Sequence, residues 1–329
     1  MSTRPFTMPK DIDSMLEVWT VAAKYPDHPE WDMQDEEQES ALDMLRTVKK
    51  LWPLFRVLLL ISPSMKDMML GYVWEEDGKR IGTANIGRRG KGDTWMVSNV
   101  AVLPDHRRKG IARKLVEACL QLGRERGAKK IILDVIDGNL PAQQLYERLG
   151  FVNYTTSVTL EFEPTASLTE QAWPTGYTIS PYAGSDWQPR YQLAQRTTPP
   201  VVQEYEPITE SVYRVPAAAR ILMPLMARLT GTVTRRYKVL AANGQIVAIG
   251  RYDVRPKKGG FNHFFVSLDP AYSEVALPLI TRLLREMLEI SPGRKIEIES
   301  SSWQTRTIEV LQTLGFKRRY GYVRMGLTI

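Results

Sequence analysis

The residues from Arg107 to Ala112 have the composition and spacing of a turn that binds a phosphate group. They follow an apolar segment, residues 100–104, and lead into a segment of helical periodicity that starts at Ile111. The first backbone N–H groups of a helix lack partners within the helix, and the helix dipole favours an anion at that end. Gly110 permits close backbone approach, and the surrounding cations attract negative charge. The pattern therefore predicts an anion-binding turn between a strand and a helix.

The helix predicted after this turn is amphipathic, and its apolar face would hold it against a sheet. Apolar residues recur three and four positions apart from Ile111 onward, at Leu115, Val116, Cys119 and Leu122. Because Cys119 lies on this apolar face, we expect it to be a buried structural thiol.

Further elements are spaced so that two polar side chains come near the turn. Strands are predicted over residues 95–102, before the turn, and over residues 130–135, after the helix. Asn139 then begins a short helix that contains Tyr146 and ends at the Leu-Gly-Phe sequence of residues 149–151. Asn139 and Tyr146 are two helical turns apart, so they lie on the same face of that helix.

This arrangement resembles the GNAT superfamily of acetyl-CoA-dependent acyltransferases. Arg107, Gly110 and Ala112 match its loop pattern, which is Gln or Arg, two residues, Gly, one residue, and Gly or Ala. The resemblance is close over residues 69–162, because the loop, the flanking strands and the following helix occur together. It implies an α/β fold with a mixed, mostly antiparallel sheet flanked by helices.

The resemblance also implies that acetyl-CoA is the cosubstrate and indicates where it binds. The loop amides would hold the pyrophosphate, and the backbone of the preceding strand would pair with pantetheine. The implied cofactor-binding residues are Val100, Ala101, Val102, Arg107, Arg108, Lys109, Gly110, Ile111, Ala112, Arg113 and Asn139.

The implied reaction is direct attack of a primary amine on the thioester, with Tyr146 as the general acid. A phenol with a pKa of about 10 can protonate a departing thiolate whose conjugate acid has a pKa of about 8.5. Backbone N–H groups at the splayed end of the strand would stabilise the oxyanion. The competing interpretation is that Tyr146 only packs in the core.

The sequence does not identify the general base. The strand over residues 95–102 has no carboxylate, and neither Asp93 nor Asp105 is well placed by spacing. A water chain, Ser98, Asn99 or a group from the other half of the chain could serve. Alternatively, the amine has a lowered pKa and needs no dedicated base.

The chain also contains an internal repeat. The Leu-Gly-Phe sequence of residues 149–151 recurs at residues 314–316, and the predicted hairpin of residues 69–82 has its counterpart at residues 237–250. The segment between the halves is rich in Pro, Ser and Thr. We predict two tandem GNAT-like domains: a catalytic domain over residues 1–163, a linker over residues 164–176 and a degenerate domain over residues 177–329.

The two predicted domains are not chemically equivalent. The counterpart of the basic turn, residues 267–277, has neither a glycine nor a cation, and Glu274 would repel a phosphate. Gln304 stands where the first half has Asn139, and Leu311 stands where it has Tyr146. Only the first half is therefore expected to bind the cofactor.

Composition and charge limit the kinds of ligand and the location that we expect for this protein. The formal net charge of +7 suits a polyanionic ligand, and the single cysteine excludes an intrachain disulfide. The apolar run over residues 51–61 is interrupted by Pro53 and Arg56 and is too short to span a bilayer. We expect a cytoplasmic protein without a signal peptide, a membrane span, a metal site or a nucleic-acid partner.

The acyl acceptor cannot be identified from the sequence. The acidic run over residues 30–39 could attract a cationic amine or form a solvated helix face. The acceptor could be a small molecule or a peptide, and the protein a monomer or a homodimer. The alternatives are a catalytically inactive CoA-binding sensor or scaffold, and an enzyme that resembles mycothiol synthases and acetylates the amine of a thiol conjugate.

Overall fold

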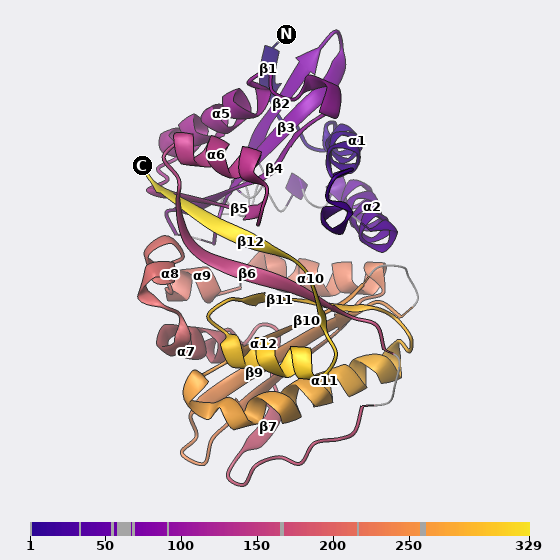
Figure 1. Cartoon of the computed structure of the whole chain (residues 1–329), viewed down its shortest axis with the longest axis vertical. Coiled ribbons are helices and arrows are strands. Elements are labelled where there is room, and N and C mark those ends of the chain that lie inside the picture. The colour runs from indigo at the N-terminus through magenta and orange to yellow at the C-terminus, as the bar shows by residue number, and fades with distance from the viewer. Residues whose placement is uncertain are drawn as a thin grey trace. The chain divides into compact units, whose positions relative to one another are not determined.

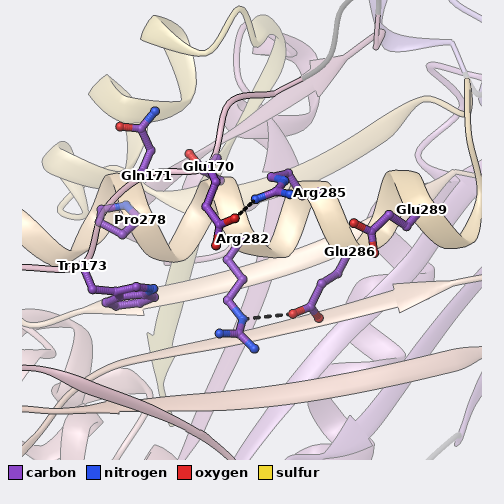
Figure 2. A pocket seen from close by; sticks show the side chains of 9 residues that line it. Glu170, Gln171, Trp173, Pro278, Arg282, Arg285, Glu286 and Glu289 are labelled. Atoms are coloured by element: carbon purple, nitrogen blue, oxygen red, sulfur yellow. Dashed lines mark hydrogen bonds and ion pairs between the residues drawn. The ribbon is translucent and has the colours of Figure 1, made fainter.

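The computed structural model describes residues 2–32, 34–53, 56–57, 67, 70–90, 92–164, 168–215, 217–256 and 261–329. Part of the apolar run over residues 51–61 and part of the predicted linker over residues 164–176 therefore lie outside the described residues. The chain forms two compact units (Figure 1). The first unit is Met1–Thr155, Glu204–Pro207 and Tyr322–Ile329, and the second is Thr156–Gln203 and Ile208–Gly321.

The first unit is built on a mixed sheet with one parallel strand pair. Neighbouring strands are antiparallel, except that β4 and β5 run parallel. In sheet order the strands are β1 (Ser2–Pro5), β2 (Leu70–Glu76), β3 (Lys79–Arg88), β4 (Thr94–Val102), β5 (Lys130–Ile136) and the end of β12 (Lys317–Thr328).

The helices of the first unit cover both faces of this sheet (Figure 1). One face is covered by α5 (Ile111–Glu125), whose buried side chains pack with those of β3 and β4. Gly82 of β3 permits this packing, because a Cβ there would lie 3.2 Å from the side chains of Ile111 and Leu115. The other helices are α1 (Ile12–Ala22), α2 (Asp35–Lys50) and α6 (Leu140–Arg148), with short 3₁₀ turns η1 (Pro29–Trp31) and η2 (Pro104–His106).

The second unit repeats this plan. Its sheet order is β6 (Val152–Phe162), β11 (Ile296–Ser301), β10 (Asn262–Leu268), β9 (Ile246–Val254), β8 (Val233–Leu240) and β7 (Thr178–Pro181), with β10 and β11 parallel. Its helices are α7 (Gln188–Thr197), α8 (Pro200–Tyr205), α9 (Glu210–Tyr213), α10 (Ala217–Thr230), α11 (Ala276–Ile290) and α12 (Thr305–Thr313), with the 3₁₀ helix η3 (Pro270–Val275). Here α11 takes the place that α5 has in the first unit, and it packs on β9 and β10.

Each compact unit contains segments from both halves of the chain. Residues 322–328 of β12 pair with β5 in the first unit, whereas residues 157–162 of β6 pair with β11 in the second. Each half of the chain thus supplies a strand to the unit of the other half. Strand pairing joins segments far apart in sequence, so an apolar pattern predicts the strand but not its partner.

Candidate active site

The site predicted from the sequence lies where β4 and β5 stop pairing. Their parallel ladder extends only from Thr94 opposite Lys130 to Met96 opposite Ile132, although both strands continue. Beyond Met96, no ladder bond joins β4 to β5 among the described strand residues. The backbone of β4 therefore presents an open edge over residues 97–102.

This open edge contains a β-bulge. The register between β3 and β4 shifts between Thr83 and Asn85, so that Asn99 and Val100 of β4 together face Ala84. Asn99 has a φ of 52°, which is unusual for a residue with a side chain. A bulge leaves one residue outside the ladder and redirects its backbone groups. The bulge thus interrupts the regular pairing of β3 and β4 at Asn99 and Val100, on the open edge of β4.

The predicted turn directly follows this edge and exposes a row of backbone amides. Arg108 and Gly110 have φ angles of 59° and 77°, and α5 begins at Ile111 without a side-chain N-cap. In the described part of the chain, no acceptor bonds the N–H groups of residues 108–113, and the first such bond runs from Lys114 N to Gly110 O at 3.1 Å. Consecutive free amides in a turn of this kind form a concave anion site.

The cations of the turn divide into two groups. Arg107 donates from Nη2 to Ala22 O at 2.8 Å and from Nε to Val102 O at 3.3 Å. It thus places a positive charge at the C-terminal end of α1, where the helix dipole favours one. Arg108 and Lys109 are exposed and, within the described residues, form no ion pair. Arg107 therefore braces the turn against α1, whereas the other two cations remain available to a ligand.

Asn139 and Tyr146 occupy α6 as predicted from their spacing. Asn139 is the N-cap residue, and its Oδ1 accepts a hydrogen bond from Ala142 N at 3.3 Å. The Tyr146 ring is 6% exposed and packs edge-on against Phe151. The Tyr146 hydroxyl has no hydrogen-bond partner among the described residues, and burial raises its pKa. The ring thus belongs to the core, while the hydroxyl remains free to donate.

Three aromatic residues near this site were not identified from the sequence. Tyr25, His28 and Trp31 lie between α1 and α2, with His28 stacked on Trp31 at 3.9 Å and Tyr25 edge-on to Trp31 at 5.5 Å. The Arg107 guanidinium lies 6.0 Å from the Tyr25 ring centre. A Cβ at Gly138 would lie 3.1 Å from Trp31, so the aromatic group contacts the turn before α6. The occurrence of three aromatic residues within seven positions is the sequence signal that could have identified this group.

Among the residues that the structure describes, no carboxylate or histidine is placed beside the bulge as a general base would be. Asp93 lies before β4, at the opposite end from the bulge, and its carboxylate is 3.9 Å from Lys129. Asn99 donates from Nδ2 to Asn85 Oδ1 at 3.2 Å. Two carboxylates contact the aromatic group: Asp32 Oδ1 accepts from Tyr25 N at 2.6 Å, and Glu30 Oε1 lies 3.1 Å from His28 Nδ1. No group of His, Cys, Asp and Glu suited to a metal ion occurs among the described residues.

In the second unit, a side chain fills the corresponding gap. The parallel ladder between β10 and β11 also stops early, after His263 opposite Glu297. There the buried Gln304 accepts a hydrogen bond from Leu268 N at 3.1 Å and donates one to Leu268 O at 3.2 Å. The amide of Gln304 therefore satisfies both backbone groups of Leu268 at the end of β10.

The remaining features of the first site are also missing from the second. The ladder between β9 and β10 runs without a register shift, so β10 carries no bulge. Asp269 caps η3 by accepting from Ala271 N at 3.2 Å, and Glu274 accepts a hydrogen bond from the Tyr177 hydroxyl. Leu311, at the position that corresponds to Tyr146, is fully buried in the core.

Comparison with solved structures identifies the fold. A tandem GNAT protein from the clavulanic acid biosynthesis pathway superposes with a TM-score of 0.67 at 15% identity, covering 99% of this chain and 98% of that one. The fold is therefore that of a tandem GNAT protein, as predicted. Residues 25–151 match the model of the acetyltransferase (GNAT) family.

Curated relatives match shorter stretches. Streptothricin acetyltransferase of Streptomyces lavendulae is 36% identical over 75 residues, which is 23% of this chain and 40% of that protein. Mycothiol acetyltransferase of Salinispora tropica is 30% identical over 139 residues, which is 42% of this chain and 40% of that protein. The chain thus spans about two fifths of the length of these two relatives. None of the helices that the structure describes is long and apolar enough to cross a membrane.

Proposed function

We propose that the protein is an N-acetyltransferase whose first unit binds acetyl-CoA and transfers the acetyl group to a primary amine. The observation that carries this proposal is the row of unbonded amides over residues 108–113, directly after the open edge of β4. The amides suit a pyrophosphate, and the edge suits an extended chain of amide groups. Both features occur in the unit that carries the family match.

In this proposal each cofactor-binding residue acts mainly through its backbone. Val100, Ala101 and Val102 pair with pantetheine, and the amides from Arg108 to Arg113 hold the pyrophosphate. Arg107 fixes the turn to α1. Asn139 caps α6 through Oδ1, which leaves its Nδ2 group as a donor toward the cofactor.

Tyr146 is the proposed general acid. Burial raises the pKa of its hydroxyl, so the group is protonated throughout the neutral range. A raised pKa makes complete proton transfer to the thiolate harder while it preserves the hydrogen bond to the developing charge on sulfur. The amine attacks the thioester carbon, the carbonyl oxygen takes up negative charge near the bulge, and coenzyme A departs as its thiol.

The second unit is proposed to be a degenerate copy that binds no cofactor. Gln304 already bonds the backbone groups at the end of β10, and Glu274 would face a phosphate with negative charge. The proposed domain boundaries, residues 1–163 and 177–329, describe this division of chemistry along the chain.

The acceptor is proposed only as a class. Mycothiol acetyltransferase gives the longer of the two curated alignments described above, which favours the amine of a thiol conjugate as one candidate acceptor. Small-molecule and peptide amines are the others. The rival proposal is a CoA-binding sensor without turnover, and it predicts cofactor binding without thiol release from any amine.

Calorimetric titration of the full chain with acetyl-CoA tests the proposal. We expect a single site per chain that Gly110→Asp abolishes, since the new carboxylate would face the pyrophosphate. Gly127→Asp is the matched control: Gly127 has a φ of 78° against 77° for Gly110, and neither position has an atom within 4 Å of an added Cβ. Equal loss in both variants, or no binding by the folded wild-type chain, would refute the proposal.

A further inference from the structure

Three arginine side chains of the second unit converge on one tyrosine. Arg190 of α7, Arg236 of β8 and Arg251 of β9 each lower the pKa of the Tyr182 hydroxyl, although burial, the largest effect, raises it. Tyr182 lies in the loop between β7 and α7, and its hydroxyl has no hydrogen-bond partner among the described residues. The backbone N–H of Tyr182 also donates to Arg236 O at 3.2 Å, so this loop lies beside β8.

Two of these arginines lie directly opposite each other in the sheet. Arg236 and Arg251 are register partners in the antiparallel pair of β8 and β9. Like charges in this position destabilise a sheet. Burial and the charge of Arg251 lower the pKa of Arg236. The fold thus holds two cations together where their mutual repulsion is unfavourable.

The hydrogen-bonding capacity of this arginine cluster is largely unused. No ion pair or hydrogen bond of the Arg236 guanidinium is found in the described part of the chain, and its Nη1 lies only 3.0 Å from the Cβ position of Gly184. The buried Nε of Arg251 also lacks an acceptor. A guanidinium that is half-buried without an acceptor loses hydration and gains nothing in exchange.

The nearby carboxylates do not neutralise the cluster. Asp253 lies 2.7 Å from Arg251 Nη2, and its charge also raises the pKa of Arg236. Asp186 acts on Tyr182 and raises the pKa of its hydroxyl. Arg190 donates to Tyr213 O at 3.5 Å. Three cations and two carboxylates leave the group with a net positive charge.

In the first unit, two arginines near the start of α1 are neutralised by one carboxylate. There the residue before α1 is Asp11, which is fully buried. Arg4 binds its carboxylate with two hydrogen bonds of 2.7 and 2.8 Å, and Arg80 lies 3.2 Å away. The residue before α7 in the second unit is Trp187, which cannot supply a counter-charge.

We propose that the cluster of Tyr182, Arg190, Arg236 and Arg251 binds a small-molecule oxyanion that carries at least two negative charges. Planar guanidinium groups bind phosphate and carboxylate oxygens through paired hydrogen bonds, and the Tyr182 hydroxyl adds a further donor. This site is separate from the proposed cofactor turn, which belongs to the first unit, and does not depend on that turn's function.

Titration with two probes tests the site and identifies the chemical group. Pyrophosphate and citrate are titrated separately into the full chain after saturation with coenzyme A, so that the turn of the first unit is already occupied. We expect at least one probe to bind, and Arg236→Gln to weaken that binding about tenfold or more because a charge-assisted pair of hydrogen bonds is lost. Preference for pyrophosphate would indicate a phosphate ligand, and preference for citrate a carboxylate ligand.

Arg235→Gln is the matched control, because it removes the same charge from the adjacent, exposed residue of β8. We expect it to change probe affinity less than about twofold, since solvent screens an exposed charge. Without ligand, Arg236→Gln should unfold at the same or a higher temperature than the wild type, as it removes like-charge repulsion. Binding of neither probe, or equal weakening by both variants, would overturn the proposal.

If the first unit binds no coenzyme A, the titrations are repeated without it. Gly110→Asp should then bind the preferred probe as tightly as the wild type. Failure of the cofactor proposal and failure of this one are therefore distinguishable.

Discussion

The corresponding strands β4 and β10 of the two units differ at the point where the parallel ladder opens. In the first unit, β4 carries a bulge at Asn99 and Val100, and the turn after it leaves the amides of residues 108–113 unbonded. In the second, β10 is regular, and the side chain of Gln304 bonds both backbone groups of Leu268. An open backbone edge can thus be kept for a ligand or satisfied from within, without any change of topology.

A similar contrast holds at the start of α1 and α7. The first unit neutralises Arg4 and Arg80 with the buried Asp11, whereas the second leaves Arg236 without an acceptor among the described residues. The two units thus differ in how the arginines near these helices are paired.

The largest expected effect concerns Tyr146, which has no chemical equivalent in the second unit. Tyr146→Phe should lower kcat about a hundredfold, as expected for the loss of a general acid, with little change in acetyl-CoA affinity. Tyr154→Phe is the control, since Tyr154 is also buried and donates to Glu206 Oε1 at 2.7 Å. Steady-state kinetics with an amine that the protein acetylates compares the kcat of the two variants. Equal kcat values would remove Tyr146 from the mechanism.

The next prediction concerns the Gln304 side chain, which fills the gap at the end of β10 in the second unit. Gln304→Ala leaves the N–H and C=O of Leu268 without their partners, so the free energy of unfolding should fall by about 2 kcal/mol. Gln312→Ala, an exposed change on the same helix α12, should cost less than about 0.5 kcal/mol. Denaturant titration compares the two. If both variants are equally stable, the gap is not held closed by this side chain.

Gln304→Ala should not create a second cofactor site. The turn after β10 would still lack a glycine and would still contain Glu274. Calorimetry should therefore find the same acetyl-CoA stoichiometry as in the wild type. A second site in this variant would show that Gln304 alone distinguishes the two units.

The smallest expected effect concerns how the ratio of wild-type to Tyr146→Phe kcat depends on pH. A general acid must be protonated, and burial raises the pKa of Tyr146 above its ordinary value of about 10. The proton is therefore retained as the pH rises, and it is lost only above that ordinary value. The ratio of wild-type to Tyr146→Phe kcat should stay constant from about pH 7 to about pH 9. A ratio that falls within this window would assign the acid to another group.

Local patterns predicted most of what positions the candidate site. The apolar spacing from Ile111 to Leu122 predicted the face of α5 that packs on the sheet, and Gly110 marked the residue just before the helix. Asn139 was predicted to begin a helix, and it is the N-cap residue of α6. These features depend on contacts within a few residues, which the sequence contains directly.

Long-range contacts were not predicted. The role of Arg107 as a brace depends on the carbonyl of Ala22, and the aromatic group of Tyr25 and Trp31 reaches Gly138 across a large sequence separation. The internal amide of Gln304 was noticed only as a substitution for Asn139. Each of these interactions joins elements whose proximity depends on the packing of the whole unit.

The sequence by itself determined the resemblance to a family, the repeated α/β plan and the turn at which one copy is basic and the other is not. Those properties are set by residue type and short-range spacing. Only the tertiary structure decided which strand completes which sheet, that Gln304 bonds β10 from within, and that Arg236 and Arg251 face each other. Register and side-chain convergence are non-local, because they depend on how distant segments pair and pack.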